Sequence, residues 1–178
     1  MTARHSAAAP RLRANRLLLM AMLTLLSLTF APITSQAQTA QAPVKIINLT
    51  ADWCASCHEF EPKLARALET YTNAEIELIN LDLTHLRAGP DSKQATIDAS
   101  KALLRFHKAS YLWDWYGGST GMAIMIASDT GEPISCVDKA YSVKEISDLI
   151  QLAGILARKA GPGRRRPDGA DCPAPMRQ

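Results

Sequence analysis

Segments typical of strands and of helices alternate along most of the chain, and this order restricts the fold more than any other feature of the sequence. Residues 44–49 (VKIINL) form a short apolar run rich in β-branched residues, and apolar residues recur at helical spacing from Phe60 to Tyr71. The same criteria predict strands at 76–83, 122–127 and 133–137, a helix ending near 107 and a last helix starting at 142. The order β-α-β-α-β-β-α predicts an α/β fold in which helices cover both faces of a central mixed sheet.

The first 37 residues have the layout of a secretory signal peptide. An apolar run, residues 17–31, is followed by the small residues Ser35 and Ala37, which suit a signal peptidase site. Four arginines precede the run: Arg4, Arg11, Arg13 and Arg16. The run is shorter than the roughly 20 residues of a membrane-spanning helix, which favours cleavage over retention as an anchor. We therefore expect export to the periplasm, a linker at 38–43 and no membrane association after cleavage.

Charge and composition divide the rest of the chain into one domain and a tail. Removal of the four N-terminal arginines, which are accompanied by no acid, lowers the formal net charge from +3 to −1. No basic face for nucleic acid remains. Residues 44–160 are long enough for one domain with a hydrophobic core. Residues 161–178 are rich in Gly, Pro and charge, so we predict a disordered, solvated basic tail there.

A pair of cysteines directly after the first predicted strand is open to two interpretations. Cys54 and Cys57 have the CxxC spacing of a redox-active dithiol, and His58 extends the motif to CxxCH, the attachment signal of haem c. Haem would need His58 as one axial ligand and a second from this set: Met122, Met125, Met176, His85 or His107. The strand immediately before the motif argues against a small helical cytochrome and favours the dithiol.

The residues around the pair resemble a known family. The stretch ADWCxxC (51–57), which follows a strand and opens a helix, resembles the thioredoxin superfamily. With EFE (59–61) behind it, the stretch is most similar to the thioredoxin-like C-terminal domain of DsbD-type reductant transporters. Pro62 and the turn in DTGEPI (129–134) also match features of the superfamily. The resemblance covers about residues 44–157 and implies a thioredoxin-like fold.

This resemblance implies a thiol-disulfide oxidoreductase that needs no cofactor, and the predicted signal peptide indicates that it is exported. Cys54, at the start of a helix, would be the attacking thiolate, because the helix N-terminus favours negative charge, and Cys57 would resolve the mixed disulfide. Trp53 would contact the substrate. Ala55 and Ser56 lack the histidine of strongly oxidising relatives, which favours a reductase or isomerase. We expect a monomer that acts on protein disulfides and takes electrons from a membrane transporter.

The sequence departs from the family at two places. Asn48 stands where a thioredoxin has a buried proton-shuttling aspartate, so Glu61, one turn beyond Cys57, becomes the candidate proton acceptor. Met122, preceded by Gly121, stands where the family has its cis-proline, and we expect a trans bond between them with both residues in the substrate site. Residues 110–121, before Met122, are predicted to form a long aromatic loop, which is a candidate docking lip or a cap on the core.

Two further questions concern the cysteines. Copper(I) bound by Cys54 and Cys57, with His58 or Met122 assisting, is the alternative to the dithiol function, which needs no metal. Cys136 and Cys172 are expected to form a structural disulfide that ties the tail to the domain. A second redox pair, or a relay from Cys172 to the dithiol, remains open.

Overall fold

The computed structural model describes residues 41–163, 165 and 172–175. The predicted signal peptide, residues 38–40 of the linker and most of the predicted tail (164, 166–171 and 176–178) lie outside the described residues. No helix within the described part of the chain is both long and apolar enough to cross a membrane.

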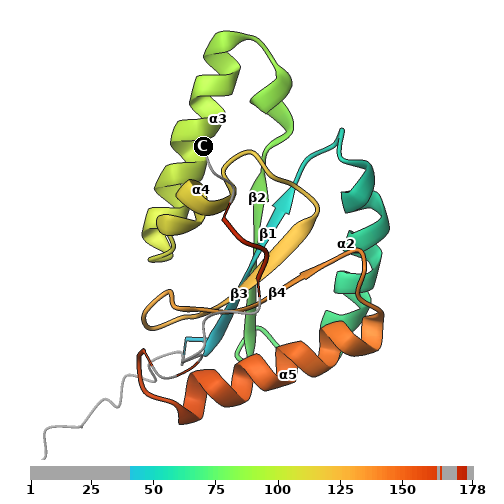
Figure 1. Cartoon of the computed structure of the whole chain (residues 1–178), viewed down its shortest axis with the longest axis vertical. Helices are drawn as coiled ribbons and strands as arrows, with labels where there is room; N and C mark the ends of the chain where they lie inside the picture. Colours follow the sequence, from blue (N-terminus) through green and yellow to red (C-terminus); the bar gives the residue numbers. More distant parts are fainter. Residues whose placement is uncertain (1–40, 164, 166–171, 176–178) are drawn as a thin grey trace, which may run out of the picture. The chain divides into compact units, whose positions relative to one another are not determined.

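A mixed sheet of four strands forms the centre of the described domain (Figure 1). Its order is β2-β1-β3-β4, and its strands are β1 (Val44–Thr50), β2 (Ile76–Asp82), β3 (Met122–Ala127) and β4 (Pro133–Asp138). β1 runs parallel to β2 and antiparallel to β3, while β3 and β4 form an antiparallel hairpin. The predicted mixed sheet is confirmed, and the structure has a thioredoxin-like fold.

Helices cover both faces of this sheet, as expected. α2 (Ala55–Leu68) and α5 (Val143–Lys159) pack on one face through a cluster that includes Phe60 and Ile146. α3 (Pro90–Phe106) and α4 (Tyr111–Tyr116) pack on the other through a cluster that includes Leu104 and Leu112 (Figure 1). α5 begins with the capping box of Ser142 and Glu145, and a short 3₁₀ helix, η2 (Thr84–Arg87), follows β2.

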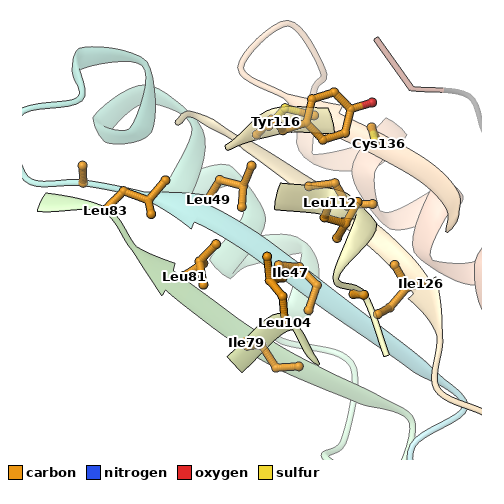
Figure 2. Packing of buried hydrophobic residues seen from close by; sticks show 14 of the residues in the cluster. Ile47, Leu49, Ile79, Leu81, Leu83, Leu104, Leu112, Tyr116, Ile126 and Cys136 are labelled. Atoms are coloured by element: carbon orange, nitrogen blue, oxygen red, sulfur yellow. The ribbon is translucent and has the colours of Figure 1, made fainter. Parts of the chain in front are cut away.

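The aromatic segment before β3 is helical where the sequence analysis treated it as a loop. α4 is a short helix, and its Leu112 and Tyr116 are buried in the cluster beneath α3 and α4. Because these two side chains are buried, the segment caps the core (Figure 2). Trp113 and Trp115 pack against the same cluster and remain partly exposed.

Alternation of side chains along β1 places polar and apolar residues on different faces. Ile47 and Leu49 point towards α3 and α4, where Figure 2 shows them beside Ile79 and Leu81 of β2. Neighbours in a strand point to opposite faces, so Asn48 and Thr50 face α2. The register pairs Leu49 with Met122. The end of β1 that leads to the cysteines therefore lies beside the start of β3.

A buried charged group lies at the opposite end of β1. The Lys45 ammonium contacts Nδ1 of His107 at 3.1 Å and the Glu77 carboxylate at 3.6 Å, and both Lys45 and His107 are buried. Burial, and then the positive charge of Lys45, lower the pKa of His107. The fold thus favours neutral His107.

This preference predicts a pH dependence of stability. As the pH falls below about 6.5, the unfolded chain binds a proton on His107 that the fold resists, so stability is lost with falling pH. His107→Gln should flatten that loss by at most about 1.4 kcal/mol per pH unit, the limit for one proton. Urea unfolding of the parent and of His107→Gln between pH 7.5 and pH 5 measures this loss of stability. His85 is exposed, so His85→Gln is the control. Parallel curves for His107→Gln and the parent would contradict the assignment.

Candidate active site

The predicted dithiol lies at the junction of β1 and α2. Cys54 is the N-cap residue of α2, and its Sγ accepts a hydrogen bond from the backbone N–H of Cys57 at 3.1 Å. The Ser56 hydroxyl lies 3.3 Å from the same sulfur. The first N–H groups of a helix have no partner within the helix, and the helix dipole is positive there. In the reduced protein, the position of Cys54 therefore stabilises a thiolate.

The structure joins Cys54 and Cys57 in a disulfide, with their Cα atoms 5.2 Å apart. Both side chains belong to the core cluster beneath α3 and α4, with Cys54 4% and Cys57 1% exposed. Cys57 Sγ lies 3.9 Å from the Leu49 carbonyl, deeper at the end of β1. The N-cap position of Cys54, and not its exposure, distinguishes it as the candidate attacking sulfur.

Trp53 is fixed by residues that follow the neighbouring strand. Its Nε1 donates to the Thr84 carbonyl at 2.8 Å, and the Arg87 guanidinium lies 3.5 Å from the centre of its ring. The Thr84 hydroxyl also accepts from the N–H of Asp52 at 3.0 Å. Thr84 and Arg87 were missed by the sequence analysis. Only the parallel register of β1 and β2, which brings the two strand ends together, could have indicated them.

Thr84 is itself held by Asp82. The Thr84 hydroxyl and N–H donate to Oδ1 of Asp82 at 2.6 and 2.9 Å, and these hydrogen bonds, the hydroxyl first, lower the pKa of Asp82. The ionised Asp82 therefore orders the turn on which Asp52 and Trp53 rest.

Glu61, the candidate proton acceptor, is in contact with Asn48, which stands at the position of the family aspartate. Asn48 Nδ2 donates to Glu61 at 3.5 Å and to Asn80 at 3.1 Å, and the Thr50 hydroxyl donates to the same oxygen of Glu61. The four side chains line a surface cavity of about 390 Å³. Cys57 and Glu61 are four residues apart in α2 and so lie on one side of the helix. Glu61 thus stands between the side of the helix that carries Cys57 and a cavity open to solvent.

Gly121 approaches the reactive sulfur closely. Its N–H donates to the Leu49 carbonyl at 2.8 Å, and its φ is +86°. A Cβ on Gly121 would lie 2.3 Å from Ser56 Oγ and 3.5 Å from Cys54 Sγ. Met122 is buried in the same cluster as the two cysteines, and the Gly121–Met122 bond is trans, as expected. The structure therefore brings both residues to the dithiol.

The second cysteine pair forms the expected disulfide, since Cys136 of β4 is bonded to Cys172. The expected solvated tail does not hold at Arg165, which is only 3% exposed. Its guanidinium lies 2.7 Å from the Asp129 carboxylate and 3.5 Å from that of Glu132. Hydrogen bonding from Arg165 also lowers the pKa of Asp129. The two carboxylates of the β3–β4 turn thus fix part of a segment whose composition predicts disorder.

The surroundings of the cysteines do not fit a covalently attached haem. Cys57 is enclosed in the core, and His58 Nε2 lies 3.1 Å from the Asp52 carbonyl. Among the candidate distal ligands, Met125 is buried on the α2 and α5 face and His107 beside Lys45. Met176 lies outside the described residues.

A copper site would have to rest on sulfur ligands. Met122 shares the core cluster with Cys54 and Cys57, whereas the His58 ring contacts the Asp52 carbonyl. Within residues 41–163, 165 and 172–175, no group of three or more His, Cys, Asp or Glu side chains is placed to hold a metal ion.

The fold and the cysteine pair define the class of protein, and comparisons with known proteins define the family. A mixed sheet with a CxxC pair between its first strand and the following helix is a thioredoxin-like arrangement, which supports thiol-disulfide oxidoreductase chemistry in general. The thioredoxin family model matches residues 29–120, more than half of the chain. The chain therefore belongs to the thioredoxin family.

Several solved structures are similar to this chain. A thioredoxin-related protein from Neisseria meningitidis is 16% identical with a TM-score of 0.42, over 66% of this chain and 89% of that chain. Tryparedoxin I from Leishmania major is 17% identical with a TM-score of 0.37, over 71% and 83%. Trxlp from Edwardsiella tarda is 14% identical with a TM-score of 0.39, over 63% and 85%. No curated protein matches the sequence.

Proposed function

We propose that this protein is an exported thiol-disulfide oxidoreductase that reduces or isomerises disulfides of periplasmic proteins. The observation that carries the proposal is the placement of Cys54 as the N-cap of α2, with the Cys57 N–H donating to its sulfur. This arrangement stabilises the thiolate over the thiol and so activates Cys54 near neutral pH.

The reaction transfers two electrons from the dithiol to a substrate disulfide. The Cys54 thiolate attacks one substrate sulfur, the substrate disulfide breaks, and the other sulfur leaves as a thiolate that takes a proton. The Cys57 thiol then gives up its proton and attacks Cys54, so the Cys54–Cys57 bond forms and the second substrate sulfur leaves as a thiolate. An external thiol donor must reduce the pair before another turnover.

Glu61 is the proposed acceptor for the Cys57 proton. It lies on the same side of α2 as Cys57, and its carboxylate borders the solvent-open cavity, from which water can carry the proton away. Asn48, an amide, has no basic group for this purpose, but its Nδ2 and the Thr50 hydroxyl position the Glu61 carboxylate.

Export and the source of electrons rest on the sequence. The basic and apolar N-terminal segment supports secretion, and N-terminal sequencing of protein recovered from the periplasm tests it. The stretch 51–61 resembles the C-terminal domain of DsbD-type transporters. We therefore propose that a membrane transporter donates the electrons and that this protein accepts them as a monomer. Reduction of the purified protein by such a transporter in membrane vesicles tests this step.

The reduction potential of the Cys54–Cys57 pair decides the direction of the reaction. We expect a value near the thioredoxin potential of about −270 mV, because Ala55 and Ser56 supply no positive charge to stabilise the reduced form. Equilibration of the purified protein with dithiothreitol or glutathione measures it, after an absorption spectrum and a metal analysis of the same sample. A potential near about −120 mV would make the protein an oxidant instead. Bound copper without a reversible couple would support the metal alternative.

A further inference from the structure

The C-terminal residues return to the end of the sheet that carries the dithiol. Cys172 is bonded to Cys136 of β4, and the Tyr116 hydroxyl of α4 donates to the Pro173 carbonyl at 2.6 Å. Figure 2 shows Tyr116 and Cys136 at one end of the core cluster, to which Cys54 and Cys57 also belong. Cys172 packs against this cluster and remains partly exposed. Residues 172–175 are thus fixed at two points near the candidate active site.

These residues form one side of a groove. A cavity of about 230 Å³ lies between Cys172 and Pro173 on one side and the ends of β3 and β4 on the other. Met122 and Asp138, which are paired in the sheet, line the strand side, and Tyr141 lines it after β4. The groove therefore combines apolar side chains with polar groups such as the Asp138 carboxylate, a lining that suits an extended peptide.

The groove begins at the residue that follows Gly121, the glycine beside the reactive sulfur. Met122 lines it, and the preceding residue, Gly121, lies against Cys54 and Ser56. A substrate cysteine bonded to Cys54 must have its Cα within about 4.4–6.8 Å of the Cys54 Cα. An extended chain advances about 3.3 Å per residue, so residues two or three positions from that cysteine lie about 7–10 Å from it, and we expect them at the groove.

We propose that Cys172 and Pro173 form the wall of a subsite for an extended segment that flanks the reacting cysteine of a protein disulfide substrate. This inference rests on the proposed function and adds a determinant of specificity to it. Cys136 and Tyr116 are positioning residues, because they hold the wall in place. The subsite favours protein disulfides over small ones, which have no flanking chain to fill it.

A purely structural disulfide would not need this location. Arg165 already anchors the C-terminal segment to Asp129 and Glu132, at the β3–β4 turn. That turn lies at the opposite ends of β3 and β4 from Met122 and Asp138. The Cys136–Cys172 bond and the Tyr116 hydrogen bond are additional constraints, and both act on the two residues that border the groove.

Substrate discrimination tests the inference. The purified protein is reduced with limiting dithiothreitol until Cys54–Cys57 is open, and mass spectrometry of the alkylated protein establishes that Cys136–Cys172 is still bonded. It is then assayed for kcat/KM with insulin, a protein disulfide, and with hydroxyethyl disulfide, a small one. The variants are Cys136→Ser combined with Cys172→Ser, which frees the wall, and Tyr116→Phe, which removes only its hydrogen bond. We expect the insulin to small-disulfide ratio to fall about tenfold in the first and about threefold in the second, the range of single interface contacts.

Tyr71→Phe is the matched control, because it removes a tyrosine hydrogen bond to the Ser147 carbonyl on the other face of the sheet. Its ratio should equal that of the parent. Thermal melts establish that each variant is folded at the assay temperature. If the double variant is unfolded, the substrate ratio of Tyr116→Phe alone decides the test. An unchanged ratio in the folded variants would show that the wall has no part in recognition. A raised ratio would show that residues 172–175 obstruct protein substrates. A parent protein that reduces neither disulfide would instead refute the proposed function itself.

Discussion

Replacement of Cys54 by serine should lower the rate of protein disulfide reduction by at least about a thousandfold, the scale expected for loss of a nucleophile. The environment at the N-terminus of α2 stabilises a thiolate, but a serine hydroxyl stays protonated at neutral pH and cannot form a disulfide. The measurement is the initial rate of insulin reduction with dithiothreitol as electron donor, compared with the rate of dithiothreitol alone.

Cys57→Ser distinguishes the two cysteines. Cys54 can still attack, but no second thiol is present to release the substrate, so a mixed disulfide through Cys54 should accumulate. Non-reducing electrophoresis followed by mass spectrometry identifies the bonded residue, and Cys136→Ser with Cys172→Ser in the same background excludes linkage through the other pair. If the mixed disulfide accumulated in Cys54→Ser and not in Cys57→Ser, the roles assigned to the two cysteines would be reversed.

The sequence patterns that predicted the fold are those set by local physics. The order of strand-like and helix-like segments, the start of the last helix at Ser142 and the turn between β3 and β4 depend on residues close together in the chain. The helical conformation of 111–116 was missed because YLWDWY contains aromatic residues that carry a weak local preference, and burial of Leu112 and Tyr116 supplies the stabilisation.

The candidate site shows the same division between local and distant information. Cys54 and Cys57 were found because CxxC is a local motif with a chemical meaning. Thr84 and Arg87, by contrast, reach Trp53 only through the parallel pairing of β1 and β2. No spacing in the sequence encodes that pairing.

The C-terminal segment gives a third example, since its composition predicts solvation. Arg165 and Cys172 nevertheless have partners on the β3–β4 hairpin. A guanidinium between two carboxylates and a disulfide can each fix a segment that has no core of its own. Composition therefore predicted the absence of a core, but it did not predict these attachments.

The polar residues behind the cysteines form a connected group. Sequence reasoning identified Glu61 as the candidate proton acceptor, because Asn48 replaces the family aspartate. Asn48 and Thr50 both donate to the same carboxylate oxygen of Glu61. The asparagine at position 48 and the Glu61 carboxylate therefore belong to one hydrogen-bonded group. Asn48 Oδ1 is buried without a hydrogen-bond partner among the described residues. Asn48 therefore contributes its donor to Glu61 and leaves its acceptor unused.

Gly121→Ala should be the most destabilising single change near the dithiol, because two costs act at one residue. The first is the backbone, since φ of +86° is unfavourable for any residue with a Cβ. The second is contact: the new Cβ would lie 2.3 Å from Ser56 Oγ and 3.0 Å from Ser56 Cβ, which is fixed on α2. Together they should lower the free energy of unfolding by about 2–4 kcal/mol. Urea denaturation measures it.

Gly118→Ala separates the two costs. Gly118 has a similar φ of +92°, but a Cβ there would meet nothing within 4 Å, so it incurs the backbone cost alone. The excess loss in Gly121→Ala then reports the contact with Ser56, and adding Ser56→Ala should recover part of it, because the nearest atom is removed. Displacement of Ser56 and Cys54 should also slow disulfide exchange in Gly121→Ala relative to Gly118→Ala, with both assayed well below their melting temperatures. Equal stability losses and equal exchange rates in the two variants would mean that residue 121 doesn't constrain the reactive sulfur, and the groove beside Met122 would then lose its physical connection to Cys54.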